Sequence, residues 1–295
     1  MIITRFAPSP TGQLHLGHAF SALVAHDDAR SGGGRYLLRI DDLDSGRVRE
    51  VYRHGIDEDL DWLGLVPDEP PLVQSQRLPA YAEALERLRG EGLAYPCFCT
   101  RADIAAQVVA SVAAPHGLTA QGPDGPAYPG TCRALDAAAA AERIAAGEAH
   151  CWRLDMGQAL ERVGGPLVWH DALRGPVDAD PAPFGDIVLA RRDAPAAYHL
   201  ASTVDDAQQG ITLVVRGADL FAATHIHRLL QALLGLPTPA YHHHALIAGP
   251  DGRRLAKRDD AASIASLRHG GVNPQQLVDA LRSGQLPLGY GWLNA

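Results

Sequence analysis

The hydrophobic pattern at the start of the chain predicts a strand, a helix and a second strand, in that order. Residues 2–6 form a short β-prone run, and a rigid Pro/Gly turn follows at residues 8–12. From Leu16 onward apolar residues recur at spacings of three and four, which is typical of a helix. A glycine-rich segment at residues 31–34 separates this helix from a second apolar run at residues 36–40. Two strands and a helix within ~40 residues predict a right-handed βαβ unit and a parallel sheet.

Later segments continue this α/β pattern around an interruption. Tyr81, Leu85 and Leu88 fall on one face of a predicted helix, whereas residues 100–150 are rich in Ala and Gly and are interrupted by Pro. The second stretch indicates an insertion outside the sheet. Beyond it the sequence predicts strands at residues 186–189 and 211–215, and helices at residues 226–234 and 274–281.

Composition and charge narrow the class of protein. The chain has 295 residues, of which 46% are hydrophobic and 20% are charged, which excludes a disordered or fibrous protein. Its formal net charge of −8 argues against a basic coat for non-specific nucleic-acid binding but allows a local basic groove. The sequence contains no run of 18 apolar residues and no signal peptide at its start, so we expect a cytoplasmic protein that does not bind membranes.

The segment from Arg5 to His18 has the features of an anion-binding site. A Pro/Gly turn between a strand and a helix directs backbone N–H groups and the positive helix end to one place. His15 and His18 lie there and can donate hydrogen bonds to phosphate oxygens, while Gly17 permits the close approach of a base or ribose. Taken alone, such a pair is equally typical of surface histidines at a helix start.

A second candidate segment is the basic, glycine-led loop at residues 252–259, which contains Lys257. A lysine on such a loop can neutralise the charge that develops on departing pyrophosphate. By itself, this run is more typical of a solvated charge cluster. The combination of the two segments changes that interpretation.

In this order and at opposite ends of the chain, the two segments resemble the HIGH and KMSKS signatures of class I aminoacyl-tRNA synthetases. Residues 5–12 (RFAPSPTG), residues 38–44 (LRIDDLD) and residues 213–220 (LVVRGADL) resemble the glutamyl/glutaminyl subgroup, whose second motif usually reads LRIEDTD. The resemblance implies a Rossmann-type catalytic domain that forms an aminoacyl-adenylate from ATP, which is used with Mg²⁺. It implies catalytic roles for His15, His18 and Lys257, with ATP bound by His15, Gly17, His18 and Lys257.

The same resemblance implies a glutamate pocket. A dicarboxylic amino acid requires guanidinium groups for its carboxylates and an acid for its ammonium group. Asp41 stands where the family usually has Glu, and Tyr198 is otherwise interpreted as a core tyrosine that caps a strand. A neutral glutamine side chain would pair less well with a pocket arginine. The implied glutamate-binding residues are Arg5, Phe6, Ala7, Pro8, Ser9, Asp41, Tyr198 and Arg216.

The size and motif set resemble the stand-alone glutamyl-queuosine tRNA(Asp) synthetases, because the short segment after Arg258 has no room for an anticodon-reading region. This resemblance implies a monomer that activates L-glutamate without tRNA and then esterifies the cyclopentene-diol of queuosine at the wobble position of the tRNA(Asp) anticodon stem-loop. The alternatives are a truncated glutamyl-tRNA synthetase, a ligase for another acceptor, or a catalytically inactive tRNA-binding paralogue.

The resemblance also divides the chain into four parts. The Rossmann-type domain is expected in two halves, and between them lies an inserted subdomain that binds zinc and resembles an acceptor-binding region. The last part carries the KMSKS-like loop and a short helical region. The expected ranges are residues 1–90, 91–185, 186–248 and 249–295.

The cysteines predict a metal site. Cys97, Cys99 and Cys132 can supply thiolates to a closed tetrahedral zinc site, which would be structural. Spacing alone favours a fourth ligand among Cys151, His116 and His150. The stand-alone family carries a C-x-C…Y-x3-C pattern, and this resemblance implies Tyr128 as the fourth ligand and Cys151 as a core residue. A metal-free insertion with reduced cysteines is the alternative.

Two further clusters receive no functional role. Residues 242–244 are three consecutive histidines, and adjacent side chains of an extended segment point to opposite faces, so that they do not readily bind one ion. Asp205 and Asp206 have the chemistry to bind magnesium, but their position beside Gln208, Gln209 and Gly210 favours a solvated turn.

Overall fold

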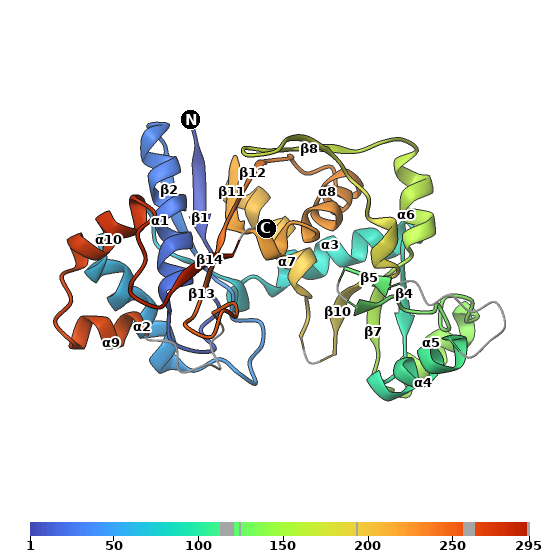
Figure 1. Cartoon of the computed structure of the whole chain (residues 1–295). Helices are drawn as coiled ribbons and strands as arrows, with labels where there is room; N and C mark the ends of the chain where they lie inside the picture. The colour runs from blue at the N-terminus through green and yellow to red at the C-terminus, as the bar shows by residue number, and fades with distance from the viewer. Residues whose placement is uncertain (113–120, 124, 193, 256–262, 294–295) are drawn as a thin grey trace.

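The computed structural model describes residues 1–112, 121–123, 125–192, 194–255 and 263–293. In Figure 1 the elements near the two ends of the chain occupy the left half of the molecule, and the elements from the middle of the chain occupy the right half. Within the described residues, none of the helices is long and apolar enough to cross a membrane.

The predicted βαβ unit is confirmed. The N-terminal strands form a parallel sheet whose order is β1 (Ile3–Phe6), β2 (Arg35–Ile40) and β3 (Leu72–Val73). The connection between β1 and β2 is α1 (Leu16–Ser31), which packs against both strands. Its inner face carries Leu16, Leu23 and several alanines, and these small residues let the helix lie close to the sheet.

A second sheet continues the catalytic half. Its order is β11 (Leu213–Gly217), β12 (Ala240–His244), β8 (Val168–Asp171) and β9 (Gly175–Asp178), and the first three strands are parallel. The backbone N–H of Thr212 donates to the carbonyl of Ile3 at 3.0 Å, which joins the adjacent edges of the two sheets. The carboxyl ends of β1, β2 and β11 therefore lie near one another, where open α/β sheets bind ligands.

The remaining strands lie in smaller sheets. β7 lies between β4 and β10 in an antiparallel arrangement, and β13 pairs with β14 close to the end of the chain. The predicted strand at 186–189 begins two residues later than expected, at Val188, and the Asp186 side chain before it accepts a buried hydrogen bond from the backbone N–H of Met156. The bounds are β4 (Ala94–Cys97), β5 (Gln121–Gly122), β6 (Gly125–Pro126), β7 (Cys151–Leu154), β10 (Val188–Arg191), β13 (Leu246–Ala248) and β14 (Gly291–Leu293).

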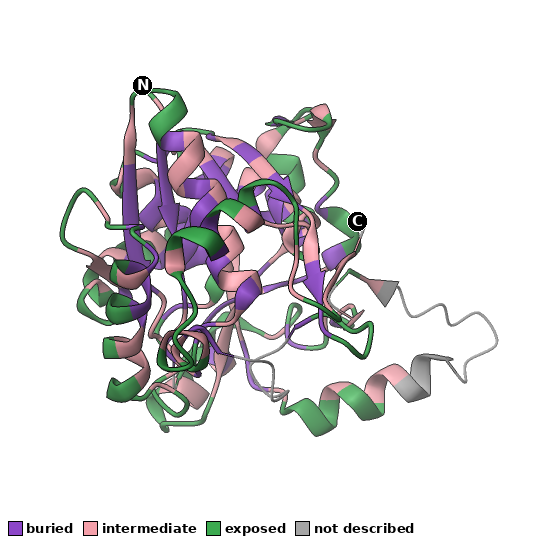
Figure 2. Cartoon of the chain, turned by 60° about the vertical axis from the view of Figure 1, so that its left-hand side comes forward, coloured by how far each residue is buried: buried purple, intermediate pink, exposed green. Residues whose placement is uncertain are grey.

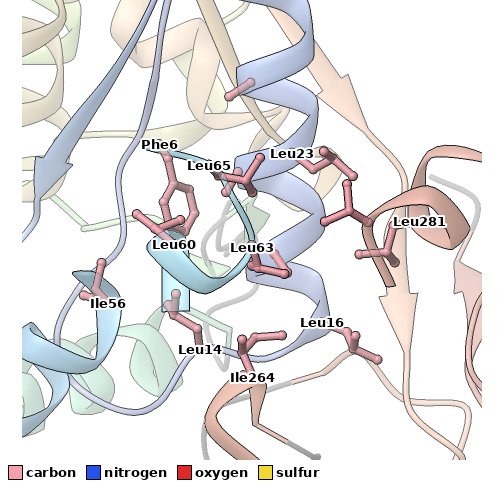
Figure 3. Close-up of a cluster of buried hydrophobic side chains, with 14 of the residues drawn as sticks. Phe6, Leu14, Leu16, Leu23, Ile56, Leu60, Leu63, Leu65, Ile264 and Leu281 are labelled. Atoms are coloured by element: carbon pink, nitrogen blue, oxygen red, sulfur yellow. The ribbon is translucent and has the colours of Figure 1, made fainter. Parts of the chain in front are cut away.

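Most helices fall into two groups, and α4 and α5 pack instead beside the cysteines. The first packs with α1 around one apolar cluster, and Figure 3 shows Phe6, Leu60 and Ile264 converging in it from distant parts of the sequence. The second group surrounds another buried cluster beneath β7 and β10. The bounds are α2 (Glu50–Trp62), α3 (Leu78–Gly90), α4 (Arg101–Val112), α5 (Ala137–Ala145), α6 (Met156–Val163), α7 (Tyr198–Gln208), α8 (Ala223–Leu233), α9 (Ile264–His269) and α10 (Pro274–Arg282), with 3₁₀ turns η1 (Gln74–Gln76), η2 (Ala182–Phe184) and η3 (Ala218–Leu220).

Burial differs most between the central strands and α4. The strands β1 and β2 are almost completely buried, whereas the described part of α4 is mostly exposed and extends away from the main body (Figure 2). Tyr81, Leu85 and Leu88 are buried on α3, and the predicted helices at 226–234 and 274–281 correspond to α8 and α10. The division of the chain into four parts stays a prediction, although β8 and β9 return from the middle part to the sheet of β12.

Candidate active site and cysteine cluster

A cavity of about 210 Å³ lies at the carboxyl ends of β1, β2 and β11. The backbone N–H of Asp41 donates to the carbonyl of Pro8 at 3.0 Å, which ties the loop after β1 to the end of β2. The structure brings all the predicted glutamate-binding residues to the wall of this cavity. They are Arg5, Phe6, Ala7, Pro8, Ser9, Asp41, Tyr198 and Arg216, and Arg39 joins them.

One side of the cavity is built from alternating buried charges. Asp206 accepts hydrogen bonds from Arg5 Nε (2.8 Å) and from Arg39 Nη1 (2.6 Å). Arg39 also donates to both carboxylate oxygens of Asp41, at 2.7 and 3.2 Å. Burial would raise the pKa of Asp206, but Arg5 and Arg39 hold it below its usual value. Each guanidinium on this side therefore has a carboxylate partner within the fold.

The prediction of a solvated turn at Asp205 and Asp206 is wrong. Both residues lie within α7 and are buried, because α7 turns this face toward β1, β2 and α3. Asp205 accepts hydrogen bonds from Arg77 Nε (2.8 Å) and from the Tyr81 hydroxyl (2.7 Å). The consecutive aspartates thus bind two different sets of neighbours and fix α7 against the cavity.

The opposite side of the cavity holds Arg216, which is only 5% exposed. Its Nε donates to His243 Nε2 at 3.1 Å, and its Nη2 donates to Thr224 Oγ1 at 2.5 Å. Its Nη1 lies 3.3 Å from both the Tyr198 hydroxyl and His227 Nδ1. Within the described residues, Arg216 forms no ion pair with a carboxylate. A buried cation with neutral partners is costly, and it is well suited to bind an anionic ligand.

His243 is kept neutral at this site. Burial lowers its pKa to about 4, and the charge of Arg216 acts in the same direction. Because Nε2 accepts from Arg216, the ring proton must lie on Nδ1, which is 2.7 Å from Asp171 Oδ2. Asp171 is held in turn by the backbone N–H groups of Leu173 and Arg174. The arrangement orients Arg216 without neutralising it.

Tyr198 lies at the first position of α7 and is 40% exposed, so the alternative of a core tyrosine is not supported. Its hydroxyl faces Arg216, and its ring also lines a neighbouring cavity of about 450 Å³. Tyr198 therefore stands between the pocket that contains Arg216 and a second space large enough for a further ligand.

A third cavity, of about 220 Å³, adjoins the first and shares His18, Ser21, Gly217 and Leu220 with it. His15 and His18 both line it, with ring centroids 3.7 Å apart, and the backbone N–H of His15 donates to His18 Nδ1 at 3.2 Å. A side chain at Gly17 would place its Cβ 3.1 Å from the His15 ring. The predicted nucleotide-binding residues His15, Gly17 and His18 thus meet at one place.

Lys257 lies outside the described residues. The described residues on either side of its segment are both at the third cavity: Leu255 lines it, and Ser263 pairs with His15 across an antiparallel bridge. The backbone N–H of Ile264 also donates to the carbonyl of Leu14 at 2.8 Å. The role of Lys257 stays a prediction.

The cysteine cluster lies in the other half of the molecule. The Sγ atoms of Cys97, Cys99 and Cys132 are within 4.8 Å of one another, and those of Cys99 and Cys132 are 3.6 Å apart. The Tyr128 hydroxyl is 3.3 Å from Cys99 Sγ. Sulfurs that share a tetrahedral zinc ion at ~2.3 Å lie ~3.8 Å apart, so the donor set fits zinc with little rearrangement.

The other candidates for the fourth metal ligand are Cys151, His150 and His116. Cys151 is the strand partner of Cys97, and the hydrogen bond from Cys151 is the largest of the effects that lower the pKa of Cys97. Among the described His, Cys, Asp and Glu residues, neither Cys151 nor His150 joins the group of three thiols. His116 lies outside the described residues. Cys151 is half-buried and packs against the buried cluster that contains Cys97 and Tyr128, which agrees with its interpretation as a core residue, and it also lines a cavity.

That cavity, of about 790 Å³, lies beside the cysteines and is strongly basic. Its wall contains Arg101, Arg153, Arg191 and Arg192. Arg153 and Arg191 also line the 450 Å³ cavity, which reaches Tyr198. The local basic groove that the net charge allows is therefore present, and it leads toward the pocket of Arg216.

Sequence reasoning missed Arg39 and His243. Arg39 belongs to a recognised motif and lies inside a buried strand. A charged residue in such a position needs a carboxylate partner, and this is the signal that could have revealed its role. The histidines at 242–244 lie within β12 itself, and their side chains alternate as expected. His243 has a definite role, since it holds Arg216. No signal in the local sequence reveals this long-range contact.

Comparison with known proteins bears on this geometry. Residues 1–287 match the family described as tRNA synthetases class I (E and Q), catalytic domain. The chain belongs to this family. The fold class predicted from the sequence is thereby confirmed, as is the predicted family.

Individual relatives within the family are similar over most of their length. The chain is 48% identical over 285 residues to a glutamyl-Q tRNA(Asp) synthetase of Rhodobacter capsulatus, and the match covers 94% of this chain and 98% of the relative. It is 43% identical to a glutamyl-Q tRNA(Asp) synthetase of Symbiobacterium thermophilum, and this match covers 95% of the chain and 85% of the relative. A glutamate--tRNA ligase 2 of Acidithiobacillus ferrooxidans is 40% identical, but the match covers 58% of that protein.

A solved structure shows the same architecture. The crystal structure of a glutamate tRNA ligase from Elizabethkingia meningosepticum in complex with its amino acid superposes with a TM-score of 0.79 at 27% identity. The match covers 95% of this chain and 60% of that protein, so the chain spans less than two thirds of the solved relative.

Proposed function

We propose that the chain activates L-glutamate with ATP and transfers the glutamyl group to queuosine in tRNA(Asp). The observation that carries the proposal is Arg216, a buried guanidinium with neutral partners at the wall of a cavity that adjoins the His15–His18 cavity. The names of the relatives similar over most of their length support the acceptor.

The two cavities suit the first step. A carboxylate of glutamate binds the fork of Arg216, and the ammonium group faces Asp41, whose carboxylate is shared with Arg39. The α-carboxylate then attacks the α-phosphorus of ATP, which arrives with Mg²⁺, and pyrophosphate leaves. His15 and His18 donate hydrogen bonds to phosphate oxygens, and Lys257 neutralises the leaving pyrophosphate.

The acceptor enters from the basic side. In the second step a hydroxyl of the cyclopentene-diol attacks the activated carbonyl carbon and gives up its proton, and AMP leaves with the electron pair of the broken acyl–oxygen bond. The 450 Å³ cavity gives a nucleoside access past Tyr198, and the arginines of the 790 Å³ cavity are placed to contact phosphates of the anticodon stem-loop. We also propose that the enzyme acts in the cytoplasm, where a tRNA acceptor would be met, and that it acts as a monomer.

We also propose one structural zinc ion, held by Cys97, Cys99, Cys132 and Tyr128. The thiol distances support this donor set, and the ion would tie the end of β4 to the segment after β6. It would supply folding energy and no chemistry, since the cluster lies apart from the cavity of Arg216.

The proposed function is tested first by glutamate-dependent ATP–pyrophosphate exchange in the absence of tRNA. Transfer of labelled glutamate is then compared for queuosine-containing tRNA(Asp), queuosine-free tRNA(Asp) and tRNA(Glu). We expect exchange without tRNA and transfer to the queuosine-containing tRNA alone. Transfer to tRNA(Glu) instead would favour the second candidate, a glutamate–tRNA ligase, to which the Acidithiobacillus relative points. The absence of exchange with any amino acid would leave an inactive tRNA-binding paralogue.

The role of Lys257 is tested in the same exchange assay. We expect Lys257→Ala to slow exchange by about 100-fold or more with the unfolding midpoint unchanged, as for other removed transition-state donors. Arg258→Ala, its neighbour, is the matched control and should stay within a few-fold of wild type. Wild-type exchange in Lys257→Ala would refute the assigned role.

The zinc proposal is tested by metal analysis of the purified protein. We expect about one zinc per chain in the wild type and in Cys151→Ser, with loss of the metal in Cys132→Ser. Retention of zinc by Cys132→Ser, or its loss from Cys151→Ser, would overturn the assigned ligand set.

A further inference from the structure

His244 is the last residue of β12, and its side chain lines the cavity that contains His15 and His18. It is 6% exposed, and its ring packs edge-on against Phe20 with centroids 5.1 Å apart. Phe20 is in turn in contact with Trp292 of β14. The ring is thus held from one side by aromatic residues and faces the cavity with the other.

The hydrogen bonding of His244 fixes which ring nitrogen carries the proton. Its Nδ1 lies 2.9 Å from the backbone carbonyl oxygen of Ala245. A carbonyl oxygen accepts hydrogen bonds, so the proton must lie on Nδ1 and the lone pair on Nε2. Burial lowers the pKa of His244, which is consistent with a neutral ring.

The lone pair on Nε2 has no partner among the described residues, although the atom is buried. Buried polar atoms almost always have a partner, and an exception that lines a ligand cavity points to the ligand. Leu246, Ile247 and Leu255 give the same cavity an apolar part that would accommodate a base. Its polar lining also includes Ser21, Asp219 and Arg254, of which Asp219 is paired with Arg254.

We propose that His244 Nε2 accepts a hydrogen bond from the nucleoside part of ATP and thereby contributes to recognition of the nucleotide. An acceptor of this kind requires a donor, and the nucleoside of ATP offers the 2′-hydroxyl, the 3′-hydroxyl and the exocyclic amino group of adenine. Phosphate oxygens are acceptors and are repelled by this lone pair. The inference rests on the proposed function, in which ATP occupies this cavity.

The test is equilibrium binding of four nucleotides to wild type, His244→Leu and His244→Gln. The nucleotides are ATP, 2′-deoxy-ATP, 3′-deoxy-ATP and purine riboside triphosphate, which lacks the amino group. Leucine removes the acceptor at similar size, whereas glutamine retains an acceptor oxygen. We expect the leucine variant to bind ATP about threefold to tenfold more weakly, and glutamine to restore part of the loss. The KM for glutamate in pyrophosphate exchange should be unchanged.

The analogues identify the donor. Wild type should bind the one analogue that lacks this donor about threefold to tenfold more weakly than it binds ATP. His244→Leu should bind that analogue and ATP equally well. If His244→Leu does not fold, His244→Met supplies the same comparison. Equal ATP affinity in wild type and the folded apolar variant, or unchanged discrimination against all three analogues, would overturn the inference. Failure of the wild type to bind ATP would instead refute the proposed function.

Discussion

The cavity at the strand ends has two sides that use arginine in opposite ways. On one side Arg5 and Arg39 share Asp206, and Arg39 holds Asp41 as well, so that positive and negative charges alternate. On the other side Arg216 is equally buried, but its described partners are the neutral groups of His243, His227, Thr224 and Tyr198.

This difference separates the framework of the pocket from its ligand-binding group. A guanidinium paired with a carboxylate has its charge compensated within the protein and contributes mainly to the fold, because it joins β1, β2 and α7. A guanidinium without a carboxylate partner retains its attraction for an anion, and the fold tolerates its desolvation cost. We therefore expect loss of the shared carboxylate of Asp206 on the first side to affect mainly stability, and loss of Arg216 on the second side to affect mainly binding.

The largest effect is expected for Asp206→Asn. The substitution leaves two buried guanidinium groups without their shared carboxylate, and breaking such a pair costs about 3–5 kcal/mol in the free energy of unfolding. Chemical denaturation measures the change. Asp44→Asn is the matched control, because Asp44 pairs with Arg47 at the surface and such pairs contribute at most about 1 kcal/mol. Equal effects of the two substitutions would remove the distinction between the two sides.

Arg216→Met should show the opposite profile. Loss of the partner of a buried carboxylate weakens binding by about 2–5 kcal/mol, so the KM for glutamate in pyrophosphate exchange should rise about 100-fold. The unfolding midpoint should change far less than in Asp206→Asn, because the variant also removes a buried charge whose partners among the described residues are all neutral. Arg216→Lys, which keeps the charge but not the fork, should be intermediate. An unchanged KM would exclude Arg216 from glutamate recognition.

A smaller effect is expected from pH through His243. Its pKa of about 4 in the folded protein lies below the ~6.5 of an unfolded chain, so the unfolded state binds the proton first. The stability that the neutral ring contributes is complete above pH 6.5 and is lost as the pH falls toward 4. Between pH 6.5 and 4.5 the wild type should lose about 2 kcal/mol more unfolding free energy than His243→Gln. Parallel stability curves for the two proteins would show that His243 is not held neutral.

How far the sequence predicts this site depends on the range of each contact. The loop after β1, the histidines at the start of α1 and the residues of β2 are local to recognised motifs, and the structure places them together as expected. The thiols of Cys97, Cys99 and Cys132 also meet as the spacing predicts.

Local motifs do not predict the contacts that pair the arginines on one side of the cavity with carboxylates and Arg216 on the other side with neutral groups. Asp206 reaches Arg5 across about two thirds of the chain, and its local sequence, with two aspartates before a glutamine pair and a glycine, is typical of a solvated turn. His243 gains its role because β12 lies beside β11, so that it faces Arg216. Both contacts are set by the packing of elements, and hydrophobic periodicity does not encode which charges that packing joins.

The smallest effect is expected at Tyr198, at the rim of the pocket. Tyr198→Phe removes one hydrogen bond of 3.3 Å to Arg216 and leaves the exposed ring in place. The bond is charge-assisted but long, and Tyr198 is 40% exposed, so its loss should cost about 0.5–1.5 kcal/mol and raise the KM for glutamate by about threefold to tenfold, with no measurable change in stability. Tyr198→Ala also removes the wall between the glutamate pocket and the 450 Å³ cavity, so it should impair transfer to tRNA more than activation. Equal losses in exchange and transfer for Tyr198→Ala would mean that the ring serves Arg216 alone and that the acceptor approaches by another route.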